Sequence, residues 1–324
     1  MTYSVVIVGL GRIGMGYDLD LDRGQFALSH ARAFTEHDGF ELVGGVDPDP
    51  AKRLAFEASY KRSAYPSVDT ALPELSPDVV VIAVPTNAHA PLLQDILEHT
   101  APRAILCEKP IAYDVMEART MLKACDERDV KLFVNYMRRS EPGAIEVKSR
   151  IETDRIAAPL KGLAWYSKGF LHNGSHFFNL LTFWLGPWID AELISAGRHW
   201  DANDPEPDVL VRFTRGTVVF MAAREEEFSY YAIELLGTNG RLRYDRGGET
   251  IEWTRRADEV LDSGCRELVR TPELLDNDMD RYQWHVADQL REGLSGADAE
   301  ICTGGEALIT LECMQNIIDM RNRS

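Results

Sequence analysis

The stretch SVVIVGLGRIG, residues 4–14, decides the fold. Its first half is a short, apolar and largely β-branched run, which is typical of a strand buried on both faces of a parallel sheet. Gly9, Gly11 and Gly14 follow at once in the spacing GxGxxG. Gly9 permits a tight turn, Gly11 lets a pyrophosphate approach the backbone, and Gly14 allows close packing of a helix. The stretch therefore predicts a strand, a glycine turn and a helix N-terminus that hold a dinucleotide. A glycine turn without a ligand is the alternative.

Similar apolar runs recur along the first half of the chain, at residues 79–84, 103–107 and 131–135. Helical patterns separate them, at residues 50–60, 88–98 and 113–127. Strand and helix alternate, so the sequence predicts an α/β fold with a doubly wound parallel sheet of the Rossmann type.

The pattern changes after about residue 140. Alternating stretches with tight-turn residues at 215–216, 239–240 and 247–248 predict antiparallel strands, and helical patterns follow at 280–293 and 305–321. We therefore expect an NAD-binding Rossmann domain over residues 1–139. An α+β domain with a large, open, mixed or antiparallel sheet follows over residues 140–324.

Composition limits the choice of partners. The formal charge of -17 over 324 residues disfavours nucleic acid and anionic membrane surfaces. Five cysteines lack a metal-like or disulfide spacing, and no leader or membrane-length apolar run is present. We expect a cytoplasmic protein without a metal site.

Asp47, after a second apolar stretch, is the acidic residue expected to bind the cofactor ribose. A carboxylate there repels a 2'-phosphate, which favours NAD over NADP. Asp47 lies 33 positions after Gly14 because of an insertion containing Asp18, Asp20 and Asp22. A calcium loop would need a glutamate that the insertion lacks, so we interpret it as a solvated acidic loop.

Several polar residues follow the predicted strands, on the sheet edge where ligands bind. His89 and Thr86 have structural alternatives as a satisfied histidine and a helix cap. Lys109 precedes Pro110, which disfavours a helical lysine and leaves it extended at the crevice. An ordinary surface lysine is its alternative. The residues expected at the cofactor are Gly9, Gly11, Arg12, Ile13, Gly14, Asp47, Pro85, Thr86, His89, Glu108 and Lys109.

The stretch KGFLHNGSHFFN, residues 168–179, places His172 and His176 four positions apart. A zinc pair of the HExxH kind would share one helix face, but Gly174 interrupts the pair and no glutamate follows His172. We predict a helix that starts after Ser175 as N-cap, with a neutral His176 in its first turn. Zinc binding, a capping histidine and proton transfer stay open as roles.

Taken in order, VGLGRIG, Asp47, VIAVPTNAHAPL, CEKPIA and HNGSHFFNLL resemble the glucose-fructose oxidoreductase and inositol dehydrogenase family of sugar and polyol dehydrogenases. The resemblance spans both halves. It implies that Lys109 lies beside the nicotinamide, that His176 handles a proton, and that the open sheet makes a homodimer or homotetramer. His172 and Asn179 stand where the family has aspartates, which puts the usual proton relay in doubt.

The resemblance implies an NAD-dependent dehydrogenase that oxidises a secondary hydroxyl of a sugar, sugar nucleotide or polyol, or runs the reverse. A redox-assisted glycosidase and a noncatalytic NAD-binding regulator are the alternatives. Lys109, His176 and His172 are the expected catalytic residues. The expected substrate contacts are Lys109, Arg139, Lys168, His172, Asn173, His176 and Asn179, and interdomain salt bridges are the alternative for the cations.

Overall fold

The computed structural model describes residues 2–201 and 204–323. The chain forms two compact units. The first contains the residues up to Ser140 together with Asp280–Leu311, and the second contains Glu141–Met279 and the residues from Glu312 onward. Residues 280–311, which follow the second unit in the sequence, therefore pack in the first.

The first unit is built on a seven-stranded sheet of order β15-β6-β5-β4-β1-β2-β3. Six strands are parallel, and the edge strand β15 pairs antiparallel with β6. This sheet confirms the predicted Rossmann class. The strands are β1 (Tyr3–Val8), β2 (Phe40–Val46), β3 (Ala64–Tyr65), β4 (Val79–Ile82), β5 (Ala104–Cys107), β6 (Lys131–Val134) and β15 (Cys302–Thr303).

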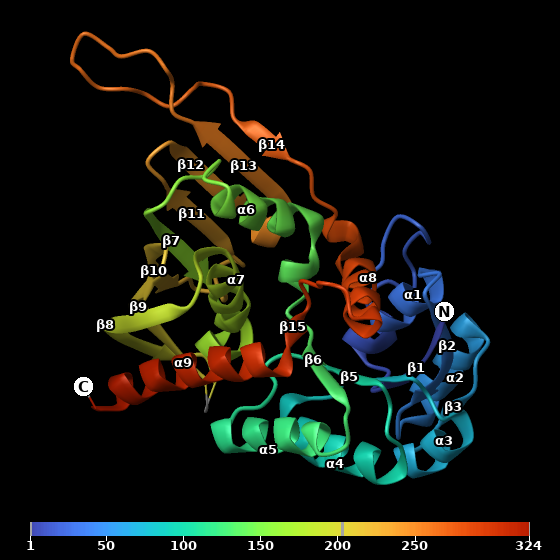
Figure 1. The fold of residues 1–324 in the computed structure, drawn as a ribbon. Coiled ribbons are helices and arrows are strands. Elements are labelled where there is room, and N and C mark those ends of the chain that lie inside the picture. The colour runs from blue at the N-terminus through green and yellow to red at the C-terminus, as the bar shows by residue number, and fades with distance from the viewer. Residues whose placement is uncertain (1, 202–203, 324) are drawn as a thin grey trace. The chain divides into compact units, whose positions relative to one another are not determined.

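Helices connect these strands, and the apolar strand residues beneath them are almost fully buried. Figure 1 shows α2 and α3 near the labelled strands β1, β2 and β3, and α4 and α5 near β5 and β6. The helices are α1 (His30–Glu36), α2 (Pro50–Tyr60), α3 (Val68–Leu75), α4 (His89–His99), α5 (Val115–Asp126) and α8 (Tyr282–Ser295); short helical turns are η1 (Arg12–Gly16), η2 (Thr86–Ala88), η3 (Met137–Ser140) and η6 (Met279–Arg281).

The second unit is built on an eight-stranded sheet of order β14-β13-β12-β11-β7-β10-β9-β8. Its neighbours are antiparallel except β7 and β10, which are parallel, so the predicted mixed sheet is confirmed. The strands are β7 (Leu160–Tyr166), β8 (Trp188–His199), β9 (Pro205–Phe213), β10 (Gly216–Ala222), β11 (Ala232–Leu236), β12 (Gly240–Asp245), β13 (Thr250–Arg255) and β14 (Glu273–Leu275).

Helix α7 (Ser175–Leu185) packs on one face of this sheet through its aromatic residues. Phe178 contacts Phe213 of β9 and Phe220 of β10, and Trp184 contacts Tyr244 of β12. Helix α6 (Pro142–Glu152) lies beside α7, and the helical turns η4 (Gly169–Gly174) and η5 (Arg246–Gly248) complete the unit. The last helix, α9 (Gly304–Arg323), begins in the first unit and ends with residues of the second.

The described residues contain no helix long and apolar enough to cross a membrane.

Candidate functional site

The glycine turn after β1 has the geometry that the sequence predicts. Gly9 has φ of +100°, and a Cβ there would overlap the carbonyl oxygen of Ala83. A Cβ on Gly14 would overlap the carbonyl oxygen of Gly9. Around Gly11, by contrast, a Cβ would meet no heavy atom within 4 Å. Gly9 and Gly14 are therefore required by packing, and open space remains at Gly11, where a ligand could approach the backbone.

The helical segment that follows the glycine turn is short. It is the single turn η1, residues Arg12–Gly16, and α1 begins only at His30. Exposed Arg12 stacks over the ring of Tyr17, and Ile13 is half-buried. The insertion thus lies between the glycine turn and the first long helix of the unit.

The interpretation of this insertion as a solvated acidic loop is wrong for Asp18. Asp20 and Asp22 are exposed, but Asp18 is fully buried and accepts hydrogen bonds from the Leu28 and Ser29 amides at 2.6 and 2.9 Å. Its carboxylate anchors the start of α1. In the described part of the chain, no group of three or more histidine, cysteine or acidic residues could hold a metal ion.

Asp47 directly follows β2 and lies beside the glycine turn. Its Oδ2 accepts a hydrogen bond from the Leu10 amide at 2.9 Å and pairs with the ammonium of Lys52 at 3.3 Å. Its Oδ1 accepts from the amide of Asp49 at 2.9 Å. The carboxyl ends of β1 and β2 are parallel neighbours, so the carboxylate sits at the edge where a ribose diol could bind.

The segment after β4 turns away from the sheet through η2, with Pro85 exposed and Thr86 half-buried. His89 is fully buried, and its ring nitrogens face the carbonyl oxygens of Ile111 and Val84 at 3.1 and 3.0 Å. Burial lowers the pKa of its imidazole. These contacts support the structural alternative for His89, which ties two loops at the strand ends together.

Glu108, immediately after β5, is the centre of a polar network that the sequence analysis missed. Its Oε1 pairs with Nε2 of His30 at 2.8 Å and accepts from Nδ2 of Asn135 at 2.6 Å. The Asn135 amide also donates to Gln283 at 3.2 Å. Burial alone would raise the pKa of Glu108, but the hydrogen bonds from His30 and Asn135 outweigh it and lower the pKa.

His30 and Gln283 lie 78 and 148 positions from the residues they contact, which is why no local motif could identify them. The network holds Glu108 rigidly, and half-buried Lys109 is the next residue along the chain. Lys109 joins Pro110 through a cis peptide bond. Since β1, β2 and β5 are parallel, Gly9, Asp47 and Lys109 follow carboxyl ends on one edge of the sheet.

Arg139, an expected substrate contact with a salt bridge as its alternative, is paired with a carboxylate. It is 6% exposed, its Nε donates to the carbonyl oxygen of Glu300 at 2.8 Å, and its Nη2 pairs with Glu306 at 2.8 Å. The carboxylate of Glu306 also accepts from Thr303 at the start of α9. Arg139 therefore fixes residues 300–306 within the first unit.

In the second unit the histidine stretch forms η4 and α7. Exposed His172 and half-buried Asn173 lie on the turn, whereas His176 and Asn179 are buried on the helix. The predicted N-cap is wrong. Ser175 is the first residue of α7, Gly174 precedes it, and the Ser175 hydroxyl donates back to the carbonyl oxygen of His172 at 3.4 Å. The reason is that the backbone is already helical from Gly169, so the amides after Ser175 do not need a capping side chain.

Lys168 enters this turn with φ of 63° and is paired with Glu225 at 2.9 Å. Hydrogen bonds from Ser167, Ser229 and Lys168 outweigh the effect of burial and lower the pKa of Glu225 to about 2. Lys168 therefore forms a salt bridge, which was the alternative to a substrate contact. The bridge is within the second unit and is not an interdomain one.

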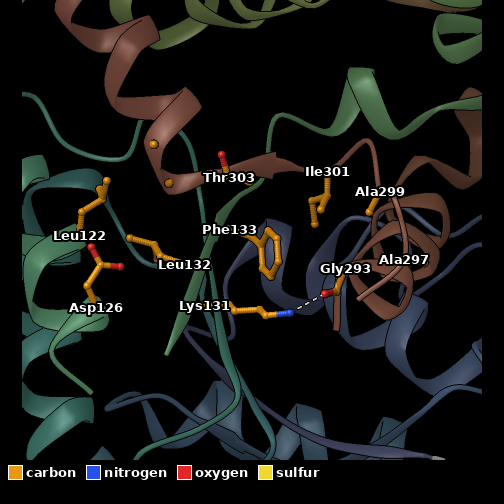
Figure 2. A pocket seen from close by; sticks show the side chains of 12 residues that line it. Leu122, Asp126, Lys131, Leu132, Phe133, Gly293, Ala297, Ala299, Ile301 and Thr303 are labelled. Atoms are coloured by element: carbon orange, nitrogen blue, oxygen red, sulfur yellow. Dashed lines mark hydrogen bonds between the residues drawn. The ribbon is translucent and has the colours of Figure 1, made fainter. Parts of the chain in front are cut away.

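One cavity of about 400 Å³ lies in the first unit between β6, β15 and the start of α9, lined by Phe133, Ile301 and Thr303 among others. Figure 2 shows Lys131 at its rim, reaching the carbonyl oxygen of Gly293. None of the predicted site residues lines it. It is therefore separate from the candidate site.

Residues 3–136 match the model of the oxidoreductase family with an NAD-binding Rossmann fold. The chain is 31% identical over 156 residues to an inositol 2-dehydrogenase of Rhizobium meliloti, a match covering 48% of this chain and 42% of that protein. It is 24% identical over 284 residues to a myo-inositol 2-dehydrogenase of Thermotoga maritima, covering 81% and 80% of the two chains. The first match thus spans less than half of that relative.

The fold is also similar to that of the WlbA dehydrogenase from Bordetella pertussis, solved in complex with NADH and UDP-GlcNAcA. The TM-score is 0.75 at 19% identity, and the alignment covers 98% of this chain and 96% of the other. This similarity extends over both units and concerns the fold alone.

Proposed function

We propose that this chain, whose residues 3–136 match the model of the oxidoreductase family with an NAD-binding Rossmann fold, is an NAD-dependent oxidoreductase acting on a carbohydrate. The reaction transfers hydride between a secondary hydroxyl carbon of a sugar, sugar nucleotide or polyol and the nicotinamide. The observation that carries the proposal is the turn at Gly11, where open space adjoins the backbone and the Asp47 carboxylate is held next to Leu10.

Lys109 and His176 carry the chemistry in this proposal. Bound NAD supplies the hydride acceptor. The Lys109 ammonium donates a hydrogen bond to the reacting oxygen, and the neutral imidazole of His176 takes the hydroxyl proton as the carbinol becomes a carbonyl. His172, Asn173 and Asn179 hydrogen-bond the other hydroxyls and hold the carbinol in place. The two chemical roles can be exchanged without changing the reaction.

Asp47 is the basis for proposing NAD rather than NADP. Its carboxylate accepts hydrogen bonds from a ribose diol and repels a 2'-phosphate. Lys52 at 3.3 Å offsets part of that charge, so the preference is a matter of degree. Asp47→Asn keeps an oxygen for the Leu10 amide and removes the charge. We expect it to improve kcat/KM for NADP relative to NAD by roughly tenfold, or about 1.4 kcal/mol. An unchanged ratio would contradict the assignment.

The open face of the eight-stranded sheet is proposed as the surface that joins copies into a homodimer or homotetramer. Leu210, Val219 and Leu163 lie in register across β9, β10 and β7, and all three side chains are half-exposed. A continuous apolar row of this kind is a typical feature of a subunit interface.

The direct experiment is to measure NADH formation with purified protein, NAD and a panel of polyols, sugars, uronates and sugar nucleotides. Steady NADH formation with one member supports the dehydrogenase. Glycoside cleavage without net NADH would favour the redox-assisted glycosidase. NAD binding without turnover of any panel member would favour the noncatalytic regulator and contradict the proposal.

A further inference from the structure

The turn that carries His172 is hydrogen-bonded to a buried carboxylate from a distant segment of the chain. Asp204 lies immediately before β9, and its side chain is 2% exposed. Its Oδ1 accepts a hydrogen bond from the Leu171 amide at 2.8 Å, and its Oδ2 accepts from the His172 amide at 2.7 Å. Both oxygens are thus committed to successive backbone amides of η4.

The backbone is shaped for this contact. Gly169 has φ of +80°, and a Cβ there would overlap the Asp204 carboxylate. The Gly169 amide donates to a second buried carboxylate, Glu206, at 3.1 Å. Three amides near the N-terminal end of the turn therefore point at carboxylates, where the direction of the backbone dipoles favours negative charge.

The two carboxylates differ in how their charge is balanced. Glu206 pairs with the guanidinium of Arg198 at 2.7 Å. The carboxylate of Asp204 accepts its hydrogen bonds from the backbone amides of Leu171 and His172. The charged form of Asp204 is therefore stabilised by the amides of the turn, and this stabilisation is lost when the turn moves away.

We propose that Asp204 is a positioning residue whose carboxylate, by accepting from two successive amides, fixes the turn that presents His172 and Asn173 to the substrate. The inference rests on the proposed function for the identity of the substrate class.

Acid should favour the closed turn. Burial raises the pKa of Asp204 to about 6, with the nearby charge of Asp201 acting in the same direction. The other ionisable groups around it are Glu206 with its partner Arg198, Tyr166 of β7, and His172 on the turn itself. The closed turn binds the proton more tightly than an open turn with a solvated Asp204 would, so protonation below that pH stabilises the closed turn.

The first test is hydrogen exchange of residues 169–174 by mass spectrometry, which needs no substrate. We expect Asp204→Asn to accelerate exchange at this turn at least tenfold at pH 7.5, and to leave residues 5–14 unchanged. Asp208→Asn is the matched control, because Asp208 lies in β9, the strand that Asp204 precedes, and its Oδ1 accepts from the Ala222 amide instead. Unchanged exchange at the turn in Asp204→Asn would overturn the proposal.

Wild-type protein gives a second reading that does not depend on how well a variant folds. Exchange of the same turn, corrected for the intrinsic rate at each pH, should be slower at pH 5 than at pH 7.5, because the closed turn binds the proton of Asp204 more tightly than the open turn. Equal protection at the two values would overturn the clamp.

The third measurement links the clamp to activity, with myo-inositol and a UDP-linked uronate as probes. Asp204→Asn should lower kcat/KM for the turned-over probe at least tenfold, with the Kd for NADH within about twofold of wild type. Wild-type kcat/KM in a variant whose turn exchanges freely would overturn the positioning role. If wild type turns over neither probe, the proposed function fails for these substrates, while the exchange measurements still decide whether Asp204 holds the turn.

Discussion

Asp204 and His89 are both buried polar residues, but burial affects their ionisation in different ways. His89 stays neutral more readily when buried and faces two carbonyl oxygens. Asp204 must carry a charge at neutral pH in a site where its hydrogen bonds come from amides. A buried carboxylate of this kind makes the stability of the protein depend on pH.

The sign of that dependence follows from the raised pKa of Asp204. The folded state binds its proton more tightly than the unfolded state, so this contribution to stability is fully present below pH 3.8 and is lost as the pH rises through about 6. The shift from 3.8 to about 6 corresponds to about 3 kcal/mol. Urea unfolding should therefore show Asp204→Asn gaining stability relative to wild type between pH 4 and pH 7. A constant difference across that range would refute the assignment.

At the scale of elements, the starts of α1 and α7 differ although both begin near a serine. Ser29 is a true N-cap of α1, because its hydroxyl oxygen accepts from the Arg32 amide at 3.4 Å and donates to Asp18 at 2.5 Å. Ser175 lies inside a path that is already helical. A serine before an apolar periodic stretch can therefore be an N-cap or lie inside a helix, and the conformation of the preceding residues decides which.

A pair of identical substitutions tests this difference. Ser29→Ala should lower the free energy of unfolding by about 1–2 kcal/mol, as expected for a lost N-cap. Ser175→Ala should cost less than about 0.5 kcal/mol, since it removes only a long hydrogen bond to the His172 carbonyl oxygen. Equal losses in urea unfolding would show that Ser175 does cap a helix.

The strands and long helices could be predicted because apolar runs and helical periodicity are local. The apolar run at 79–84 became β4, and the pattern at 113–127 became α5. The glycine turn could be predicted because its motif is local in the sequence, although the backbone that excludes a Cβ at Gly9 belongs to the distant Ala83. The short η1 could not be foreseen, because burial of Asp18 and not a periodic pattern decides where α1 begins.

The candidate site was predictable only where its residues follow strands. Asp47 and Lys109 were found that way. His30 and Gln283 reach Glu108 from distant segments, and Asp204 reaches the histidine turn from before β9. Arg139 and Lys168 were expected at the substrate because they are cations in an acidic chain, but each has a carboxylate partner within its unit.

At the scale of the whole molecule, the half-exposed apolar row on the eight-stranded sheet is the basis of the proposed assembly. Val219→Lys, at the centre of that row, should convert the proposed oligomer to a monomer in light-scattering measurements. Leu54→Lys is the control, because Leu54 of α2 is 67% exposed and lies outside the second unit. A monomeric wild type, or an oligomer that survives Val219→Lys, would contradict the proposed interface.

The central claim is that Lys109 and His176 act on the same hydroxyl. The most direct measurement is a double-mutant cycle on kcat with Lys109→Ala, His176→Ala and the double variant, at saturating NAD and substrate. We expect each single change to lower kcat roughly 100-fold or more, and the double variant to be little slower than the worse single variant, because groups that work as a unit are not additive. Wild-type turnover in the single variants, or losses that multiply in the double variant, would contradict the account.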